Sequence, residues 1–226
     1  MKLMELYRRL LRHFGRQNWW PARTRFEMMV GAILTQRTKW ENAEKAVKNL
    51  EKAGLLNPVA LAKTPVDKLE RLVRPAGFYR QKARRLLSLA KLIADEYRGD
   101  LDAFLSRPPE ELRKELLSIY GVGKETADSI LLYAAGRLYF PVDAYTKQIL
   151  HRMGLTPKNI GYEQLRSFIE ENIDRDLAVY REFRALLVVL GKTYCRKRPL
   201  CQKCPVSDLC SWGSGRRGNA KMPAEG

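Results

Sequence analysis

All four cysteines of this chain lie in one short segment near the C-terminus, in the pattern Cys-x5-Cys-x2-Cys-x5-Cys: Cys195, Cys201, Cys204 and Cys210. Zinc ribbons use two Cys-x2-Cys pairs separated by a longer span, whereas this segment has one such pair with wider spacing on each side. The spacing favours a [4Fe-4S] cluster held by four thiolates. Zinc, and free or disulfide-bonded thiols, are the alternatives. Because four ligands leave no open position for chemistry, we expect a structural site.

One carboxylate stands where a helix is expected to begin. Asp143 follows Pro141-Val142 and precedes the helical pattern of 144–153, so it can serve as an N-cap. A negative charge is stabilised beside the positive end of a helix dipole. An ionised carboxylate held there can stabilise a positive charge that develops during a reaction. A purely structural cap is the alternative.

A Gly-Val-Gly turn separates two helical patterns, 109–117 and 124–135. Gly121 and Gly123 allow a tight turn and a close approach of the backbone to another surface, and we expect Val122 to tuck between the helices. The free N–H groups at the start of the second helix, with Lys124 beside them, favour an anion such as a phosphate. An ordinary helix connection is the alternative, but the basic character of the chain favours a phosphate-binding hairpin.

The hairpin and the segment Phe140–Thr146 together resemble the endonuclease III superfamily of helix-hairpin-helix DNA glycosylases, and the resemblance extends over nearly the whole chain up to Cys210. The family hairpin has the form Leu-Pro-Gly-Val-Gly, so Ile119 and Tyr120 depart from it here. The first cysteine spacing is also one residue shorter than the usual x6, x2, x5. The resemblance implies that Asp143 is catalytic, stabilising the charge on the sugar as the glycosidic bond breaks, and that the cysteines hold a [4Fe-4S] cluster.

Family members that also cleave the DNA strand carry a nucleophilic lysine two residues after the second glycine of the hairpin. Glu125 occupies that position here, and Lys124 lies one residue earlier, rotated by about 100° around the helix. Without a positioned amine, no Schiff base forms by the usual route. The sequence therefore predicts a monofunctional glycosylase, without AP lyase activity, in which water is the nucleophile.

Trp19-Trp20-Pro21, Trp40 just after Thr35-Gln36-Arg37-Thr38, and the acidic residue at 125 most resemble the 3-methyladenine DNA glycosylase III branch of the superfamily. That resemblance implies a pocket in which a flipped, alkylated purine stacks between Trp40 and either Trp19 or Trp20. Alkylation makes the base cationic, which strengthens stacking on electron-rich rings. Simple core packing is the alternative for the tryptophans.

An enzyme that acts on a base inside a duplex must extrude it and fill the gap. The resemblance implies that Gln36 enters the vacated space and that Phe78, followed by Tyr79 and Arg80, is the wedge. Several basic residues after the wedge could contact phosphates: Arg80, Lys82, Arg84 and Arg85. Alternatively, Phe78 and Tyr79 cap the following helix and the charges form a solvated face.

The chain that must position these groups has 226 residues and a formal net charge of +17, which indicates a polyanionic partner. Apolar residues recur with helical period in most of it, and no alternating run indicates a sheet, so the predicted fold class is all-α. Ten longer helices are expected, near 3–14, 25–35, 40–52, 66–73, 83–97, 109–117, 124–135, 144–153, 162–172 and 178–193.

The expected fold is bilobal. Residues 21–140 would form a central helical bundle with the hairpin. Residues 1–20 with 141–210 would form a second lobe with the cluster, and 211–226 a flexible basic tail. Neither a signal peptide nor a transmembrane segment is expected, so we predict a cytoplasmic, nucleoid-associated monomer. We expect it to bind double-stranded DNA with a damaged base and no membrane.

Removal of alkylated purines such as 3-methyladenine is the favoured reaction. One alternative is an endonuclease III-like glycosylase and AP lyase acting on oxidised pyrimidines, or a uracil or thymine mismatch glycosylase. A non-catalytic DNA-binding module is a further alternative, which the presence of Asp143 disfavours.

Overall fold

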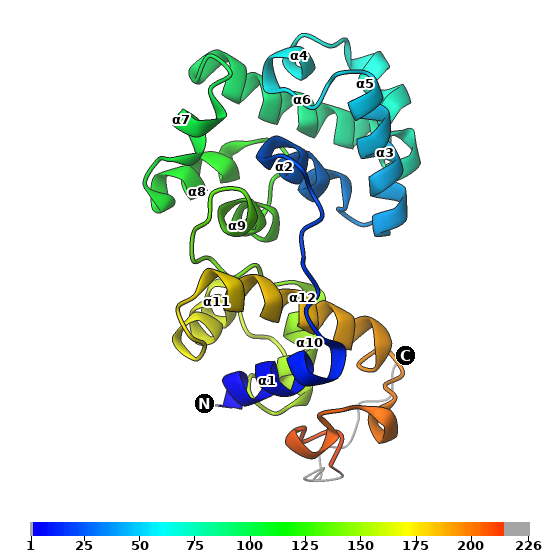
Figure 1. The fold of residues 1–226 in the computed structure, drawn as a ribbon, viewed down its shortest axis with the longest axis vertical. Helices are drawn as coiled ribbons and strands as arrows, with labels where there is room; N and C mark the ends of the chain where they lie inside the picture. The colour runs from blue at the N-terminus through cyan, green and yellow to red at the C-terminus, as the bar shows by residue number, and fades with distance from the viewer. Residues whose placement is uncertain (1, 215–226) are drawn as a thin grey trace. The chain divides into compact units, whose positions relative to one another are not determined.

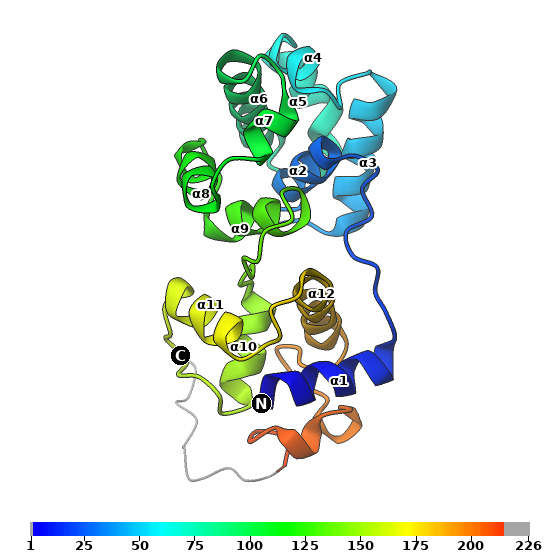
Figure 2. The same cartoon turned by 60° about the vertical axis from the view of Figure 1, so that its left-hand side comes forward.

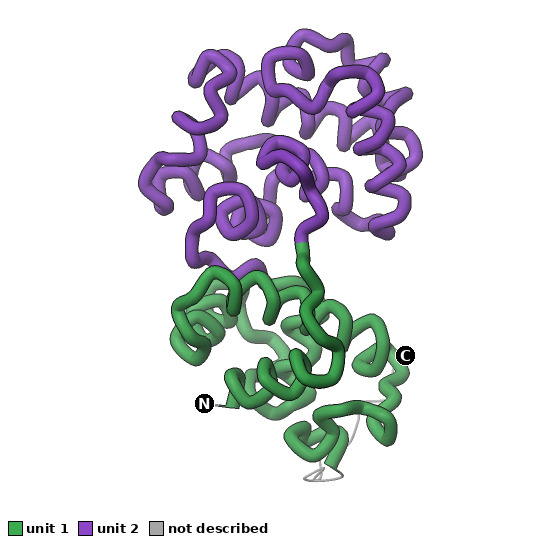
Figure 3. Tube along the Cα trace, viewed as in Figure 1, with its two compact units in different colours: residues 1–19, 142–226 green, residues 20–141 purple. Residues whose placement is uncertain are grey.

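The computed structural model describes residues 2–214, and these contain helices and turns but no strand (Figure 1). The all-α fold class predicted from the sequence is therefore confirmed. Contacts divide the chain into two compact units (Figure 3). Unit 1 combines residues 1–19 with the residues from Val142 onward, and unit 2 is Trp20–Pro141.

Unit 2 contains a 10-residue helix that is almost wholly buried and an 18-residue helix with one buried face. All residues of α2 (Arg25–Leu34) after the first are buried, as expected of a helix that is apolar on every side. The 18-residue α6 (Tyr79–Glu96) packs against α4 and α5, as both views show (Figures 1 and 2). The remaining elements of this unit are α3 (Trp40–Lys52), α4 (Pro58–Ala62), α5 (Val66–Val73), the 3-10 turn η1 (Arg74–Ala76), α7 (Leu101–Leu105), α8 (Pro109–Ser118) and α9 (Lys124–Tyr133).

Unit 1 is organised around α12 (Leu177–Thr193), whose side chains are largely buried and which packs against α1 (Lys2–Phe14) and α10 (Ala144–Arg152). Helix α11 (Tyr162–Glu171) and two 3-10 turns, η2 (Cys201–Lys203) and η3 (Ser207–Leu209), complete the unit. No helix in the described part of the chain is long and apolar enough to cross a membrane.

Side-chain caps explain where several helices begin. The Oγ1 atom of Thr24 accepts a hydrogen bond from the backbone of Glu27 at the start of α2. Asp143 and Asp176 accept equivalent bonds at the starts of α10 and α12. Such caps satisfy N–H groups that have no partner within the helix. The start of α10, and with it the position of Asp143, is therefore fixed locally.

Each of the ten expected helices is present, with small shifts at several ends, but the two short helices α4 and α7 were not predicted. Both are five residues long, too short to show a helical period in the sequence. Of the expected tail 211–226, only residues 211–214 are described. They are held to α10 by a bond from Ser211 Oγ to Met153 O of 3.0 Å and one from Trp212 N to Arg152 O of 3.1 Å. The remainder of that stretch lies outside the described residues.

Candidate functional site

The hairpin joins α8 to α9 through Ile119–Gly123. The backbone N–H of Val122 donates to Ile119 O at 3.0 Å and closes the turn, while the Val122 side chain is buried in the core of unit 2. Gly121 has φ +77°, and a Cβ there would lie 2.1 Å from Arg85 Nε. Glycine is therefore required at 121 both by the backbone conformation and by the packing of Arg85.

At position 123, neither the backbone conformation nor the packing requires glycine. Its φ of −94° suits any residue, and a Cβ would meet nothing within 4 Å. It is the N-cap of α9 and has no side chain to cap the first N–H groups of that helix. The exposed Lys124 follows at once. The N-terminus of α9 thus combines open space, helix N–H groups and a cation, which suits a phosphate.

Gln36 lies in the loop between α2 and α3 and is bonded to this hairpin. Its Nε2 donates to Gly121 O at 3.2 Å and to Thr126 Oγ1 at 3.0 Å. Its Oε1 accepts from Arg85. The side chain expected to fill the gap in DNA is therefore engaged within the protein, and would have to leave these partners to do so.

Phe78 is the residue before α6, with φ +47° and a side chain that is 55% exposed. The guanidinium of Arg37 lies over its ring, 5.4 Å from the centroid. Tyr79 is half-buried, with Arg80 and Arg74 near its ring at 5.7 and 6.0 Å. Phe78 therefore projects from the surface, as a wedge must, and does not cap α6 against the core.

Lys82 does not face solvent, and the expectation that it contacts phosphates is wrong. It is 1% exposed, and its Nζ donates to Leu34 O at 2.9 Å and to Ala76 O at 2.7 Å. Burial, with a smaller effect from Arg85, lowers the pKa of its amine to about 8. Lys82 instead links the end of α2 to η1.

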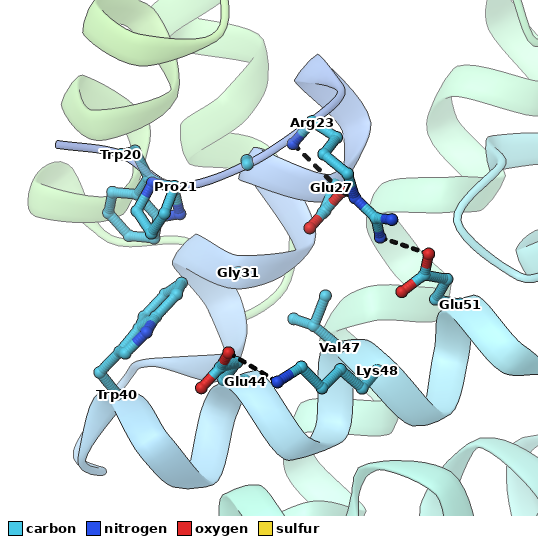
Figure 4. Close-up of a pocket in the computed structure, with 11 residues that line it drawn as sticks. Trp20, Pro21, Arg23, Glu27, Gly31, Trp40, Glu44, Val47, Lys48 and Glu51 are labelled. Carbon is cyan, nitrogen blue, oxygen red and sulfur yellow. Dashed lines mark hydrogen bonds and ion pairs between the residues drawn. The ribbon is translucent and has the colours of Figure 1, made fainter. Parts of the chain in front are cut away.

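A cavity of about 340 Å³ opens beside α2 and α3, and its wall includes Trp20 and Trp40 (Figure 4). The two indoles meet edge to face with centroids 5.7 Å apart, and Tyr133 lies 5.7 Å from Trp20 on another side. A Cβ at Gly31 would come within 3.3 Å of Trp20 Nε1, so the glycine lets the indole lie close to α2. The structure thus brings Trp20 and Trp40 together.

Charged side chains also line this cavity. Glu27 is nearly buried, and Arg23 Nε approaches its Oε2 at 3.5 Å. Arg23 also pairs with Glu51. Glu44 accepts from Lys48 at 2.8 Å (Figure 4). The wall therefore combines aromatic faces with ion pairs, in which each of these carboxylates has a cationic partner.

Trp19 belongs to unit 1 and does not line that cavity. Its ring lies 5.7 Å from the guanidinium carbon of Arg184. Arg184 is 7% exposed, and its Nη2 also lies 3.6 Å from Asp143 Oδ2. Sequence analysis missed Arg184, although it sits between the buried Tyr180 and Leu187 on one helical stripe.

Asp143 is 8% exposed and its two carboxylate oxygens have different partners. Oδ1 accepts from Thr146 N at 2.7 Å and from Thr146 Oγ1 at 2.9 Å. Oδ2 faces Arg184. The preceding residue is also held, since Val142 N donates to the hydroxyl of Tyr162 at 3.3 Å. The Asp143 carboxylate is therefore held by two hydrogen bonds on one oxygen and faces a cation with the other.

Glu125 is an exposed residue in the first turn of α9, and its backbone oxygen accepts from Ser129 Oγ at 2.7 Å. Lys124 is exposed beside it. The structure thus exposes an acidic side chain two residues after Gly123, in the first turn of α9.

All four cysteines line one small cavity in unit 1, together with Arg152 and Trp212. Within the described residues, no three His, Cys, Asp or Glu side chains form a group that could hold a metal ion. Burial raises the pKa of the Cys204 thiol to about 11. Arg152 Nη1 lies 3.4 Å from Cys195 Sγ and 2.7 Å from Arg196 O, so it ties α10 to the cysteine segment.

Together the all-helical fold, the glycine hairpin and the capped aspartate define a helix-hairpin-helix protein. Residues 30–175 match the family described as HhH-GPD superfamily base excision DNA repair protein. The chain is 47% identical to a provisionally named DNA repair glycosylase of Methanocaldococcus jannaschii, over 92% of this chain and 95% of that one. The chain belongs to the HhH-GPD superfamily, and it is a base excision repair DNA glycosylase of that family.

Two further similarities bear on the branch of the family. Endonuclease III of Thermotoga maritima is 29% identical, covering 96% of each chain. The structure of the 3-methyladenine DNA glycosylase MagIII of H. pylori bound to 1,N6-ethenoadenine superposes with TM-score 0.75 and 30% identity, covering 85% of this chain and 98% of that one. An endonuclease III–DNA complex superposes with TM-score 0.81 at 23% identity, covering 96% of this chain and 98% of that one, and shows the shared fold.

Proposed function

We propose that this protein hydrolyses the N-glycosidic bond of alkylated purines such as 3-methyladenine in duplex DNA. The observation that carries this proposal is the cavity in which Trp20 and Trp40 meet, with the Glu27 carboxylate in its wall. Such a cavity suits a flat, positively charged base, which gains from aromatic faces. The similarity to the 3-methyladenine glycosylase, a structure with a modified adenine bound, supports the same substrate class.

Asp143 is the catalytic carboxylate of this proposal. The bond between C1′ and the base breaks with its electron pair moving to the cationic base, which leaves neutral. Positive charge develops on the sugar, and the ionised carboxylate stabilises it. The oxygen of a water molecule then bonds to C1′, and its proton passes to solvent. A cationic base is a good leaving group, so this reaction needs little acid catalysis.

Glu125 supports the monofunctional part of the proposal. A carboxylate cannot form the Schiff base that precedes strand cleavage in a bifunctional enzyme. The neighbouring Lys124 lies about 100° further around α9, as counted from helix geometry. Water is therefore the nucleophile, and the abasic product stays intact until another activity or alkali cleaves it.

DNA would be held through unit 2 by the loops described above. Gly121, Val122, Gly123 and Lys124 form a hairpin for a backbone phosphate. Phe78 is the wedge, and Tyr79 and Arg80 flank it. Gln36 supports the hairpin through its bonds to Gly121 and Thr126. Within unit 1, Arg184 lies by the Trp19 ring and faces the Asp143 carboxylate.

We propose that the four cysteines hold a structural [4Fe-4S] cluster. Their residue types fit, since four thiolates are the usual ligands of this cluster, and all four border the same cavity. When bound, the group would supply no reaction step and would order the loop 195–210.

A second candidate is an endonuclease III-like glycosylase and AP lyase acting on oxidised pyrimidines. The similarity to the Thermotoga maritima endonuclease III over nearly the full length of both chains favours it. In that case Lys124, the exposed lysine nearest the required position, would be the nucleophile.

One cleavage assay separates these functions. Duplexes carrying 3-methyladenine, thymine glycol, uracil or a T·G mismatch are incubated with the protein, and strand breaks are scored with and without alkali. We expect release of 3-methyladenine, with breaks only after alkali, and at least about a hundredfold loss of rate in Asp143→Asn. Spontaneous nicking, with borohydride trapping that is lost in Lys124→Ala, would refute the monofunctional assignment. Unchanged activity in Asp143→Asn would refute the role of Asp143.

A further inference from the structure

Two exposed side chains from different loops of unit 2 stack on one another. Arg37 follows α2, Phe78 precedes α6, and the guanidinium lies 5.4 Å from the centre of the ring. Both residues have positive φ, +54° and +47°, which L residues adopt only at an energetic cost. The strained backbone at these two residues accompanies an exposed aromatic ring, since the Phe78 side chain is 55% exposed.

The two loops are linked directly beneath this pair. The buried amine of Lys82 donates to the carbonyls of Leu34 and Ala76, at 2.9 and 2.7 Å. Leu34 lies three residues before Arg37, and Ala76 two residues before Phe78. The Lys82 amine therefore joins the two segments that carry Arg37 and Phe78.

The neighbour of Arg37 is engaged elsewhere. Gln36 uses its amide nitrogen on Gly121 and Thr126 and its amide oxygen on Arg85. Arg37 is exposed and forms no ion pair with any residue that the structure describes. Of these two polar residues, Arg37 is the more exposed.

We propose that Arg37, supported by the Phe78 ring, contacts the base left unpaired opposite the lesion and so sets the opposite-base preference of the enzyme. This inference rests on the proposed function, because it needs a base to be extruded. Phe78 enters the gap as an apolar wedge. A guanidinium that stacks by its face keeps its N–H edge free, and that edge donates to the orphaned base.

The geometry of the donor predicts which base is preferred. The arginine fork delivers two parallel N–H bonds and needs two adjacent acceptors. Guanine offers O6 and N7, and an unpaired cytosine offers O2 and N3. In thymine an N–H group separates the two carbonyl oxygens, and in adenine an amino group adjoins each of the reachable ring acceptors. A guanine or cytosine opposite the lesion is therefore favoured.

The test uses binding, so it does not depend on which damaged base the enzyme removes. Four duplexes carry a tetrahydrofuran abasic analogue opposite guanine, cytosine, adenine or thymine, and an intact duplex is the reference. Kd is measured by fluorescence anisotropy for the wild type, Arg37→Ala, Arg37→Lys and Arg80→Ala. Arg80→Ala is the matched control, since it removes an arginine that also lies by an aromatic ring near the start of α6.

We expect the wild type to bind the guanine or cytosine duplex at least about fivefold more tightly than the others, the lower end for one bidentate arginine–base pair. Arg37→Ala and Arg37→Lys should lose this difference, because lysine offers no fork, while Arg80→Ala weakens all four duplexes equally. A wild type without preference, or an Arg37→Ala variant that weakens all four duplexes equally, overturns the inference. Failure to prefer any abasic duplex over the intact one instead refutes base extrusion, and the proposed function with it.

Discussion

Lys82 provides a quantitative test of the structure, because a buried amine makes the stability of unit 2 depend on pH. Its pKa is lowered from 10.5 to about 8, chiefly by burial. The unfolded chain therefore binds more protons than the folded chain between these values, and stability rises with pH in this window. The cost of burying the ammonium is fully present below the folded pKa and disappears as pH rises toward the unfolded pKa.

The magnitude follows from the two pKa values. Near pH 7 both states are protonated, and the difference of about 2.5 units costs roughly 3 kcal/mol. Near pH 9.5 the folded amine is neutral, and the remaining cost is roughly 1 kcal/mol. Since Lys82 is 1% exposed, solvent does not screen this effect. Relative to Lys82→Met, the wild type should gain about 2 kcal/mol in the free energy of unfolding between the two pH values.

The assay is urea or guanidinium unfolding of wild type and Lys82→Met at both pH values, followed by circular dichroism. Subtracting the free energy of unfolding of Lys82→Met from that of the wild type removes the contribution of other titrating groups. The neutral Lys82 amine can still donate hydrogen bonds to the carbonyls of Leu34 and Ala76. Lys91→Met removes an exposed amine from the same helix and is the matched control. Its free energy of unfolding should differ from that of the wild type by the same amount at both pH values. A wild type whose free energy of unfolding, relative to that of Lys82→Met, stays constant or falls as pH rises would show that Lys82 is not a buried cation in solution.

Three further predictions concern the hairpin, the cluster and the catalytic carboxylate. Gly121→Ala should cost about 2 kcal/mol or more of unfolding free energy because of its positive φ and the contact with Arg85. Gly123→Ala should cost less than about 1 kcal/mol of unfolding free energy but weaken DNA binding severalfold. Equal losses of stability in Gly121→Ala and Gly123→Ala would contradict the roles assigned to the two glycines. Cys204→Ser should lose the visible absorption band and most of the four iron atoms expected per chain, whereas one zinc per chain in the wild type would exclude the cluster. Arg184→Met should cost about 3 kcal/mol by leaving the Asp143 carboxylate without its counter-ion, and the cost should largely vanish when Asp143→Asn is made in the same chain.

The long helices could be predicted because their burial follows from local sequence. Apolar residues of α6 recur every three or four positions, and α2 is apolar all round, so both patterns specify a buried helix without knowledge of its partners. The hairpin and the cap at Asp143 are also local, since their hydrogen bonds join residues three or four positions apart. Local rules of turn and cap chemistry suffice for such features.

Contacts between distant segments could not be predicted in this way. Arg184 reaches Asp143 only because α12 packs on α10, and the sequence contains no local trace of that pairing. Lys82 was assigned to the surface because it lies in a run of basic residues. Its carbonyl partners belong to η1 and to a helix end nearly fifty positions earlier. A charge is expected to be solvated unless tertiary structure supplies partners, and only coordinates reveal those partners.

Part of the positive charge of this chain is structural, which changes what the net charge says about DNA. Lys82 and Arg85 hold loops of unit 2 in place, Arg113 pairs with the buried Asp128, and Arg184 faces Asp143. None of these four cations is free to replace counter-ions on phosphates. Because the salt dependence of DNA binding counts only neutralised phosphates, its slope should follow the exposed cations that reach phosphates and not the formal charge of +17. Within unit 2, Lys82, Arg85 and Arg113 instead join the segments that flank the hairpin and the loop of Arg37.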